Sequence, residues 1–146
     1  PTAMYAPWLE YNESVKSVII EDGITTIGEN SFRYCRYMES LEIGSDVTSI
    51  GGNAFYECYK LESVKIPDNV ETIENGAFLN CEGLVTAKIG SGVETISEHA
   101  FSGCISLADL EIGSNVTTLE DYAFYFCKKL NFRFKCYFIS IIKSCH

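Results

Sequence analysis

A unit of 23 residues repeats five times along this chain and constrains its fold more than any other feature. One aliphatic side chain recurs in phase, as Ile27, Ile50, Ile73, Ile96 and Leu119. A phenylalanine and a cysteine recur in the same way: Phe32, Phe55, Phe78, Phe101 and Phe124, and Cys35, Cys58, Cys81, Cys104 and Cys127. A fixed period of this kind is typical of a solenoid, in which each unit buries its apolar face against its neighbours.

Each unit is expected to form one coil of the solenoid. In the copy at 50–72, the stretch 61–66 alternates apolar and polar residues, as a strand with one buried face does. Residues 67–69 (Pro-Asp-Asn) predict a turn in which the Asx side chains bond their own backbone. The Ala-Phe pair opens the segment 54–58, which we expect to form one helical turn. The small alanine beside each phenylalanine lets the rings stack as a continuous spine.

The unit, I-x-x-x-A-F-x-x-C-x-x-L-x-x-(L/V)-x-I, resembles the BspA-like, or treponemal-type, leucine-rich repeats. The match covers residues 15–130, with Ser31 for alanine, Met38 for leucine, and glycine often in place of the family's proline. The resemblance implies a leucine-rich-repeat solenoid, a right-handed superhelix of the α/β class but rich in strands. One parallel sheet would line its concave face over about five to six turns of the repeat.

The whole chain, 1–146, is expected to be a single repeat domain. Residues 1–26 form a degenerate N-terminal repeat that caps the array, 27–130 hold the regular repeats, and 131–146 are an irregular C-terminal strand or tail. Shortening the template by one residue after the regular repeats turns the phenylalanines of this tail inward and makes a sixth strand. A truncated or disordered tail is the alternative. An apolar edge of this kind favours pairing with another chain.

Composition narrows the classes of partner. The net charge of −9 argues against nucleic acid and against anionic membranes, which both need a basic surface. No run approaches the roughly 18–20 apolar residues that cross a bilayer, so we expect no membrane insertion. The chain begins at Pro1 with no basic and apolar leader, so no secretion signal is visible. The missing initial methionine suggests a piece of a longer protein.

The five in-phase cysteines are interpreted as buried free thiols. Side chains in one column lie roughly 4.8 Å apart and point the same way, and parallel Cβ vectors disfavour a disulfide. Bridging and metal binding remain the alternatives. Because no Cys-x-x-Cys pair occurs and histidine is nearly absent, zinc is disfavoured. We expect neither a metal nor a cofactor.

Two groups of side chains are candidates for binding. The first, the Tyr/Arg patch, gathers tyrosine and arginine, which are frequent in binding hot spots; it comprises Arg33, Tyr34, Arg36, Tyr37, Tyr56 and Tyr59. The alternative is that these tyrosines only cover the flank of the phenylalanine spine. The second group, the charge column, is a weaker candidate on the outward strand face; it comprises Glu42, Lys65, Lys88 and Glu111. Its alternative role is a ladder of neutralising pairs that stops the strands from slipping.

These features predict a non-catalytic protein-binding module. Catalysis needs converging groups, and His99 has no Ser-His-Asp arrangement among its column neighbours, Gly76 and Tyr122. The resemblance implies a cell-surface or secreted protein of the adhesion type, whose partner would be a host extracellular or matrix protein. The alternatives are a rigid spacer within a larger protein and homo-association through the C-terminal edge.

Overall fold

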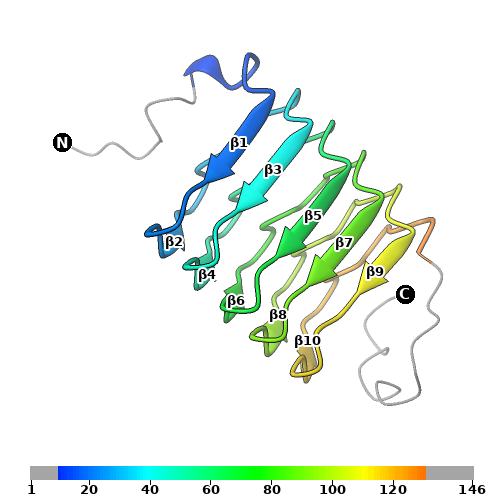
Figure 1. Ribbon diagram of the computed structural model, residues 1–146. Coiled ribbons are helices and arrows are strands. Elements are labelled where there is room, and N and C mark those ends of the chain that lie inside the picture. The colour runs from blue at the N-terminus through cyan, green and yellow to red at the C-terminus, as the bar shows by residue number, and fades with distance from the viewer. Residues whose placement is uncertain (1–9, 131–146) are drawn as a thin grey trace.

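The computed structural model describes residues 10–130, which form a stack of similar coils (Figure 1). Each coil contributes one longer and one short strand. The strands are β1 (Ser17–Ile20), β2 (Thr26–Ile27), β3 (Ser40–Ile43), β4 (Ser49–Ile50), β5 (Ser63–Ile66), β6 (Thr72–Ile73), β7 (Thr86–Ile89), β8 (Thr95–Ile96), β9 (Asp109–Glu111) and β10 (Thr118–Leu119). The repeat solenoid that the sequence predicted is confirmed. From the first strand to the last it makes about four full turns of about 23 residues, slightly fewer than the expected five to six.

All the strand pairing is parallel, and it occurs on two faces. The short strands pair in the order β2-β4-β6-β8-β10, and the longer strands form the sheets β1-β3 and β5-β7-β9. Pairs such as Val18 with Leu41, and Ala87 with Leu110, join residues one repeat apart. The sheet of short strands is a second face that the sequence did not predict. Because the register equals the repeat length, like residues of successive copies lie in columns.

Between β3 and β5 the face of longer strands is interrupted, although these strands lie side by side (Figure 1). Pro67 directly follows β5, at the position that other copies fill with Gly44 or Gly90. The Gly44 N–H donates to the Ile20 carbonyl at 2.8 Å, and proline has no N–H with which to make this bond. The interruption therefore coincides with a missing backbone donor.

A continuous column of phenylalanine rings forms the centre of the core. Neighbouring ring centroids lie 5.1–5.4 Å apart, with the planes at 6–12°, in the order Phe32, Phe55, Phe78, Phe101 and Phe124. The three interior rings have no exposed surface, whereas the first ring is only partly buried. The predicted spine is confirmed, and it fixes the stacking of the turns that carry the Tyr/Arg patch.

In the cysteine column, Cys35, Cys58, Cys81 and Cys104 are free thiols. Four of the five in-phase cysteines are buried and Cys127 is partly exposed. Each thiol from Cys58 onward donates to the phenylalanine carbonyl of the preceding coil, at Sγ–O distances of 3.2–3.4 Å. Burial raises the pKa of the Cys35 thiol to about 11. The expectation of buried thiols holds for these positions because the thiol serves as a small apolar group with a weak donor.

The turn at 67–69 is present, but its Asx side chain bonds the neighbouring coil and not its own backbone. The Asp68 carboxylate accepts the backbone N–H of Ser91 at 2.8 Å, and Asp22 accepts that of Ser45 at 2.9 Å. The same column thus links successive coils at the ends of the longer strands.

The predicted helical turn at 54–58 is wrong, because the segment is a run of tight turns. Between residues 53 and 58, the even-numbered amides donate to carbonyls three residues back, while the odd-numbered amides donate to the next coil. A helix would keep all of these hydrogen bonds within its own turn. The alternation uses every second amide to hold the coils together.

This alternation places two residues of each coil in the left-handed backbone conformation, with φ between 52° and 74°. The first left-handed column is Asn30, Asn53, Gly76, His99 and Tyr122. The second left-handed column is Tyr34, Glu57, Asn80, Gly103 and Phe126. Glycine and asparagine tolerate this conformation, whereas other residues lose about 1–2 kcal/mol in it. The aromatic and acidic members are therefore unusual occupants.

Residues 1–9 and 131–146 lie outside the described residues. The predicted division into an N-terminal cap, regular repeats and a C-terminal strand or tail stays a prediction. Within residues 10–130, no helix is long and apolar enough to cross a membrane.

Candidate functional site

The Tyr/Arg patch is assembled from two turns that the repeat register places side by side. Arg33 and Tyr56 occupy one column, and Tyr34 and Glu57 occupy the next. The Tyr34 N–H donates to the Tyr56 carbonyl at 2.8 Å, which joins the two turns through their backbones. The structure therefore brings together residues that lie more than twenty positions apart in the sequence.

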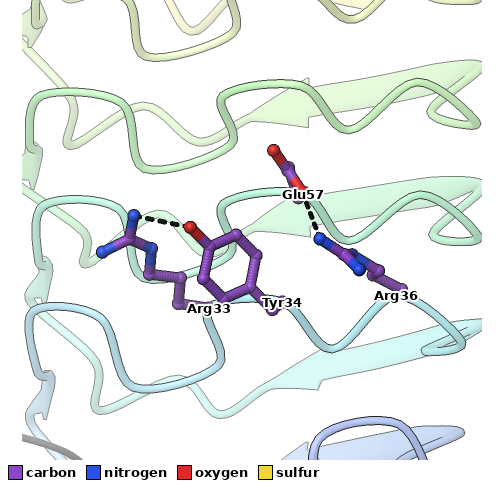
Figure 2. Close-up of polar contacts among 4 residues, drawn as sticks. All are labelled: Arg33, Tyr34, Arg36 and Glu57. Carbon is purple, nitrogen blue, oxygen red and sulfur yellow. Dashed lines mark hydrogen bonds and ion pairs between the residues drawn. The ribbon is translucent and has the colours of Figure 1, made fainter.

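Arg33 is held between two tyrosine rings. Its guanidinium carbon lies 4.6 Å from the centroid of Tyr34 and 5.0 Å from that of Tyr56. Nη2 donates to the Tyr34 hydroxyl at 2.8 Å (Figure 2), and the two rings meet edge to face at 5.3 Å. The Nε atom is buried without a hydrogen-bond partner. These contacts fix the guanidinium in place, and none of the ion pairs among the described residues involves it.

Arg36, in contrast, is neutralised by Glu57. The Nη2–Oε2 distance is 3.0 Å (Figure 2), and the arginine also lies over the rings of Tyr34 and Tyr59, at 5.3 and 5.6 Å. Burial raises the pKa of the Glu57 carboxyl, but hydrogen bonds from Tyr59, Tyr56 and Arg36 together lower the pKa below its usual value. The bond to this carboxylate raises the pKa of Tyr59 to about 12. Glu57 is thus a charged member of the patch at neutral pH.

Sequence reasoning missed Glu57, although a signal for it was present. Glu57 stands between the two predicted tyrosines of its turn, one repeat after Tyr34. Both residues have a left-handed backbone, with φ of 57° and 65°, where later copies have Asn80 and Gly103. Tyr37, the remaining predicted member, is 51% exposed and makes none of the ring contacts found among residues 10–130.

The charge column is aligned as predicted but does not alternate in sign throughout. Lys65 pairs in register with Lys88, and Lys88 with Glu111. The Lys88 Nζ and Glu111 Oε2 atoms form an exposed ion pair at 2.8 Å. Glu42 and Lys65 stand on opposite sides of the interruption between β3 and β5, and both line an open cleft of about 710 Å³ beside the column. Exposed pairs of this kind contribute little to stability.

The remaining chemical features of the described residues are the contacts of His99 and the placement of possible metal ligands. His99 stacks on Tyr122, and its Nε2 atom lies 3.4 Å from the Glu98 carboxylate. In residues 10–130 there is no group of three or more His, Cys, Asp or Glu side chains placed to hold a metal ion. The Tyr/Arg patch, in contrast, presents aromatic faces and a fixed guanidinium.

The stacked parallel coils, with their phenylalanine and cysteine columns, define a leucine-rich-repeat solenoid. The chain belongs to the family described as the BspA type leucine rich repeat region, whose model matches residues 9–131 in six copies. Members of such repeat families are generally protein-binding or structural and generally non-catalytic. A comparison with curated proteins found no match.

One solved leucine-rich-repeat structure shares this fold at low sequence identity, and two others match this chain with lower structural similarity. A T. pallidum leucine rich repeat protein is 22% identical, with a TM-score of 0.61 over 82% of this chain and 66% of its own. A Bacteroides ovatus leucine-rich repeat protein is 23% identical, with a TM-score of 0.41 over 78% and 42% of the two chains. A leucine rich cell surface protein of Faecalibacterium prausnitzii is 22% identical, with a TM-score of 0.38 over 80% and 52%. The chain thus spans 66% or less of the length of these proteins.

Proposed function

We propose that this chain is a non-catalytic protein-binding module of a surface or secreted, adhesion-type protein, and that it binds through the Tyr/Arg patch. Membership of a repeat family that generally binds proteins supports the binding role. BspA-like proteins are described as surface proteins, which supports the location and a host extracellular or matrix protein as partner.

The observation that carries the proposal is that Arg33 is held in place and forms no ion pair among the described residues. Arg36 already has a carboxylate partner in Glu57, whereas Arg33 is fixed between the rings of Tyr34 and Tyr56 and has no carboxylate within the described part of the chain. A guanidinium that is immobilised before binding loses less entropy when it meets a partner. An acidic group of the partner would pair with Arg33 while apolar atoms cover the tyrosine faces.

Backbone conformation adds independent support. Tyr34 and Glu57 occupy the second left-handed column. Asn80 and Gly103 in the same column adopt this backbone conformation with little strain. The strained residues do not fill the core, because their side chains lie on the flank. Backbone strain of this kind is typical of functional sites.

The test compares two variants of the full chain for retention on immobilised host matrix proteins. The patch variant carries Arg33→Ser, Tyr34→Asn and Tyr56→Ser, which are residues that later copies carry in the same columns. The control variant carries Glu42→Gln and Lys65→Gln on the strand face and leaves the net charge unchanged. Loss of the anchored arginine and two rings is expected to weaken retention at least about tenfold. The control variant should be retained on the matrix proteins as strongly as the parent protein.

Unchanged retention by a patch variant with a native circular dichroism spectrum would exclude this patch as the binding surface. Equal retention of the parent and both variants at background level would favour the rigid spacer. The self-association alternative falls on 131–146, outside the described residues. Light scattering of the chain with and without that segment tests this alternative. If the number of chains per particle is the same in both, self-association through this segment is excluded.

A further inference from the structure

A second aromatic surface lies on the same flank, in the last described coil. We call Tyr122, Tyr125 and Phe126 the distal aromatic cluster; these side chains are 45%, 40% and 53% exposed. Tyr122 and Tyr125 meet edge to face at 5.6 Å, and Tyr125 and Phe126 lie 5.3 Å apart. On one face, Tyr122 is stacked against His99 at 5.1 Å and 8°. The rings support one another while much of their surface faces solvent.

The backbone holds two of these rings outward at an energetic cost. Tyr122 and Phe126 occupy the first and second left-handed columns, with φ of 59° and 63°. Two copies earlier the same columns hold Gly76 and Asn80, which adopt the conformation without strain. The distal aromatic cluster therefore shares with the Tyr/Arg patch the feature that marks it as more than core packing.

The Tyr/Arg patch and the distal aromatic cluster differ in which positions carry a cationic side chain. Tyr125 occupies the column position of Arg33, and Lys128 occupies that of Arg36. The Lys128 ammonium lies 4.7 Å from the centroid of the Phe126 ring, so one ring of the cluster already contacts a cation. Across residues 10–130, no lysine or arginine lies over Tyr122 or Tyr125. These tyrosines lack the guanidinium that Arg33 supplies to the Tyr/Arg patch.

Acidic residues stand next to Tyr122 in the sequence and next to its stacking partner in the neighbouring coil. Glu120 and Asp121 directly precede Tyr122, and Glu98 directly precedes its stacking partner, His99. The Glu120 carboxylate accepts the Glu98 N–H at 2.9 Å, which keeps the two coils in register here. Acidic residues that adjoin aromatic residues in the sequence, on a chain with net charge −9, are complementary to a basic group.

We propose that the distal aromatic cluster binds an arginine side chain from a basic segment of a partner protein. The partner's guanidinium stacks on Tyr122 and Tyr125, in the role that Arg33 has in the Tyr/Arg patch, and is attracted by the carboxylates of Glu120 and Asp121. This surface is separate from the Tyr/Arg patch and selects the opposite charge.

The experiment uses the full chain and, as the probe, a peptide of alternating arginine and glycine, with binding measured by titration calorimetry. The cluster variant carries Tyr122→Gly and Tyr125→Ser, residues that earlier copies place in the same columns. The matched control carries Tyr34→Asn and Tyr56→Ser in the Tyr/Arg patch. None of these substitutions changes the net charge. The cluster variant should bind the peptide about tenfold more weakly, and the control should bind it as the parent chain does.

Equal binding by the cluster variant and the parent chain would overturn the proposal, because net charge alone would then explain the attraction. No binding by the parent chain would overturn it as well. A peptide of alternating lysine and glycine separates guanidinium stacking from general attraction, and equally tight binding of that peptide would refute the role of arginine. If the cluster variant lost its native circular dichroism, ring-proton shifts of Tyr122 and Tyr125 in the parent chain would decide: shifts on peptide addition support the proposal, and their absence refutes it.

Discussion

Phe78 provides the most direct test of the stacked spine. Its ring is completely buried and stacks on both sides, at 5.1 Å from Phe55 and 5.1 Å from Phe101. Phe78→Ala removes the ring's transfer free energy and leaves a cavity, which together cost about 3–5 kcal/mol. Each stacked pair contributes about 0.5–1.5 kcal/mol beyond area burial, so a ring with two partners belongs near the top of that range.

Phe32 provides the matched comparison within the same column. It begins the spine, is only partly buried, and stacks on Phe55 at 5.4 Å. Phe32→Ala removes a ring that already contacts solvent, and water can fill the space that the ring leaves. The expected cost is on the order of 1–3 kcal/mol, clearly less than that of Phe78→Ala.

Urea unfolding followed by far-ultraviolet circular dichroism measures both changes, with linear extrapolation to zero denaturant. Phe78→Leu keeps most of the apolar volume and serves as a variant that remains folded if the alanine variant does not. The reasoning fails if Phe78→Ala and Phe32→Ala lower the free energy of unfolding equally. It also fails if Phe78→Ala costs less than about 1.5 kcal/mol, because a buried ring with two stacked neighbours cannot be removed so easily.

Two further predictions concern close approach and alkaline stability. Gly90→Ala should lower the free energy of unfolding by about 1–3 kcal/mol, because the new Cβ would collide with the Pro67 carbonyl. Gly52→Ala should change the free energy of unfolding little, because its Cβ would meet its nearest atom at 3.4 Å. Equal effects of the two substitutions in urea unfolding would contradict this prediction. The pKa of Cys35 is raised from 9.0 to about 11, so its contribution to stability is complete below pH 9 and is lost as the pH rises toward about 11. Urea titrations across this range should show the decline, and Cys35→Ala should reduce its slope; an unaltered slope would argue against a buried thiol.

The candidate sites were less predictable than the columns from which they are built. The proximity of Arg33 to Tyr56 follows from the period alone, since one repeat separates them. Which arginine is neutralised does not follow, because Arg36 meets Glu57 across 21 positions and not across a full repeat. That diagonal contact depends on how the long side chains turn once the backbone is fixed. Only the folded geometry separates the paired arginine from the unpaired one.

The sequence by itself determined the columns and their register. A period that equals one coil places each phenylalanine on the next, and apolar burial leaves no competing arrangement, so the spine and the thiol column could be predicted. The tertiary structure decided what happens between those positions. Local propensity favours a helical turn after the Ala-Phe pair, but bonds from alternate amides to the neighbouring coil impose tight turns and left-handed residues such as Tyr34 and Tyr122. The interruption at Pro67 has the same origin, since a missing N–H matters only where a neighbouring coil offers an acceptor.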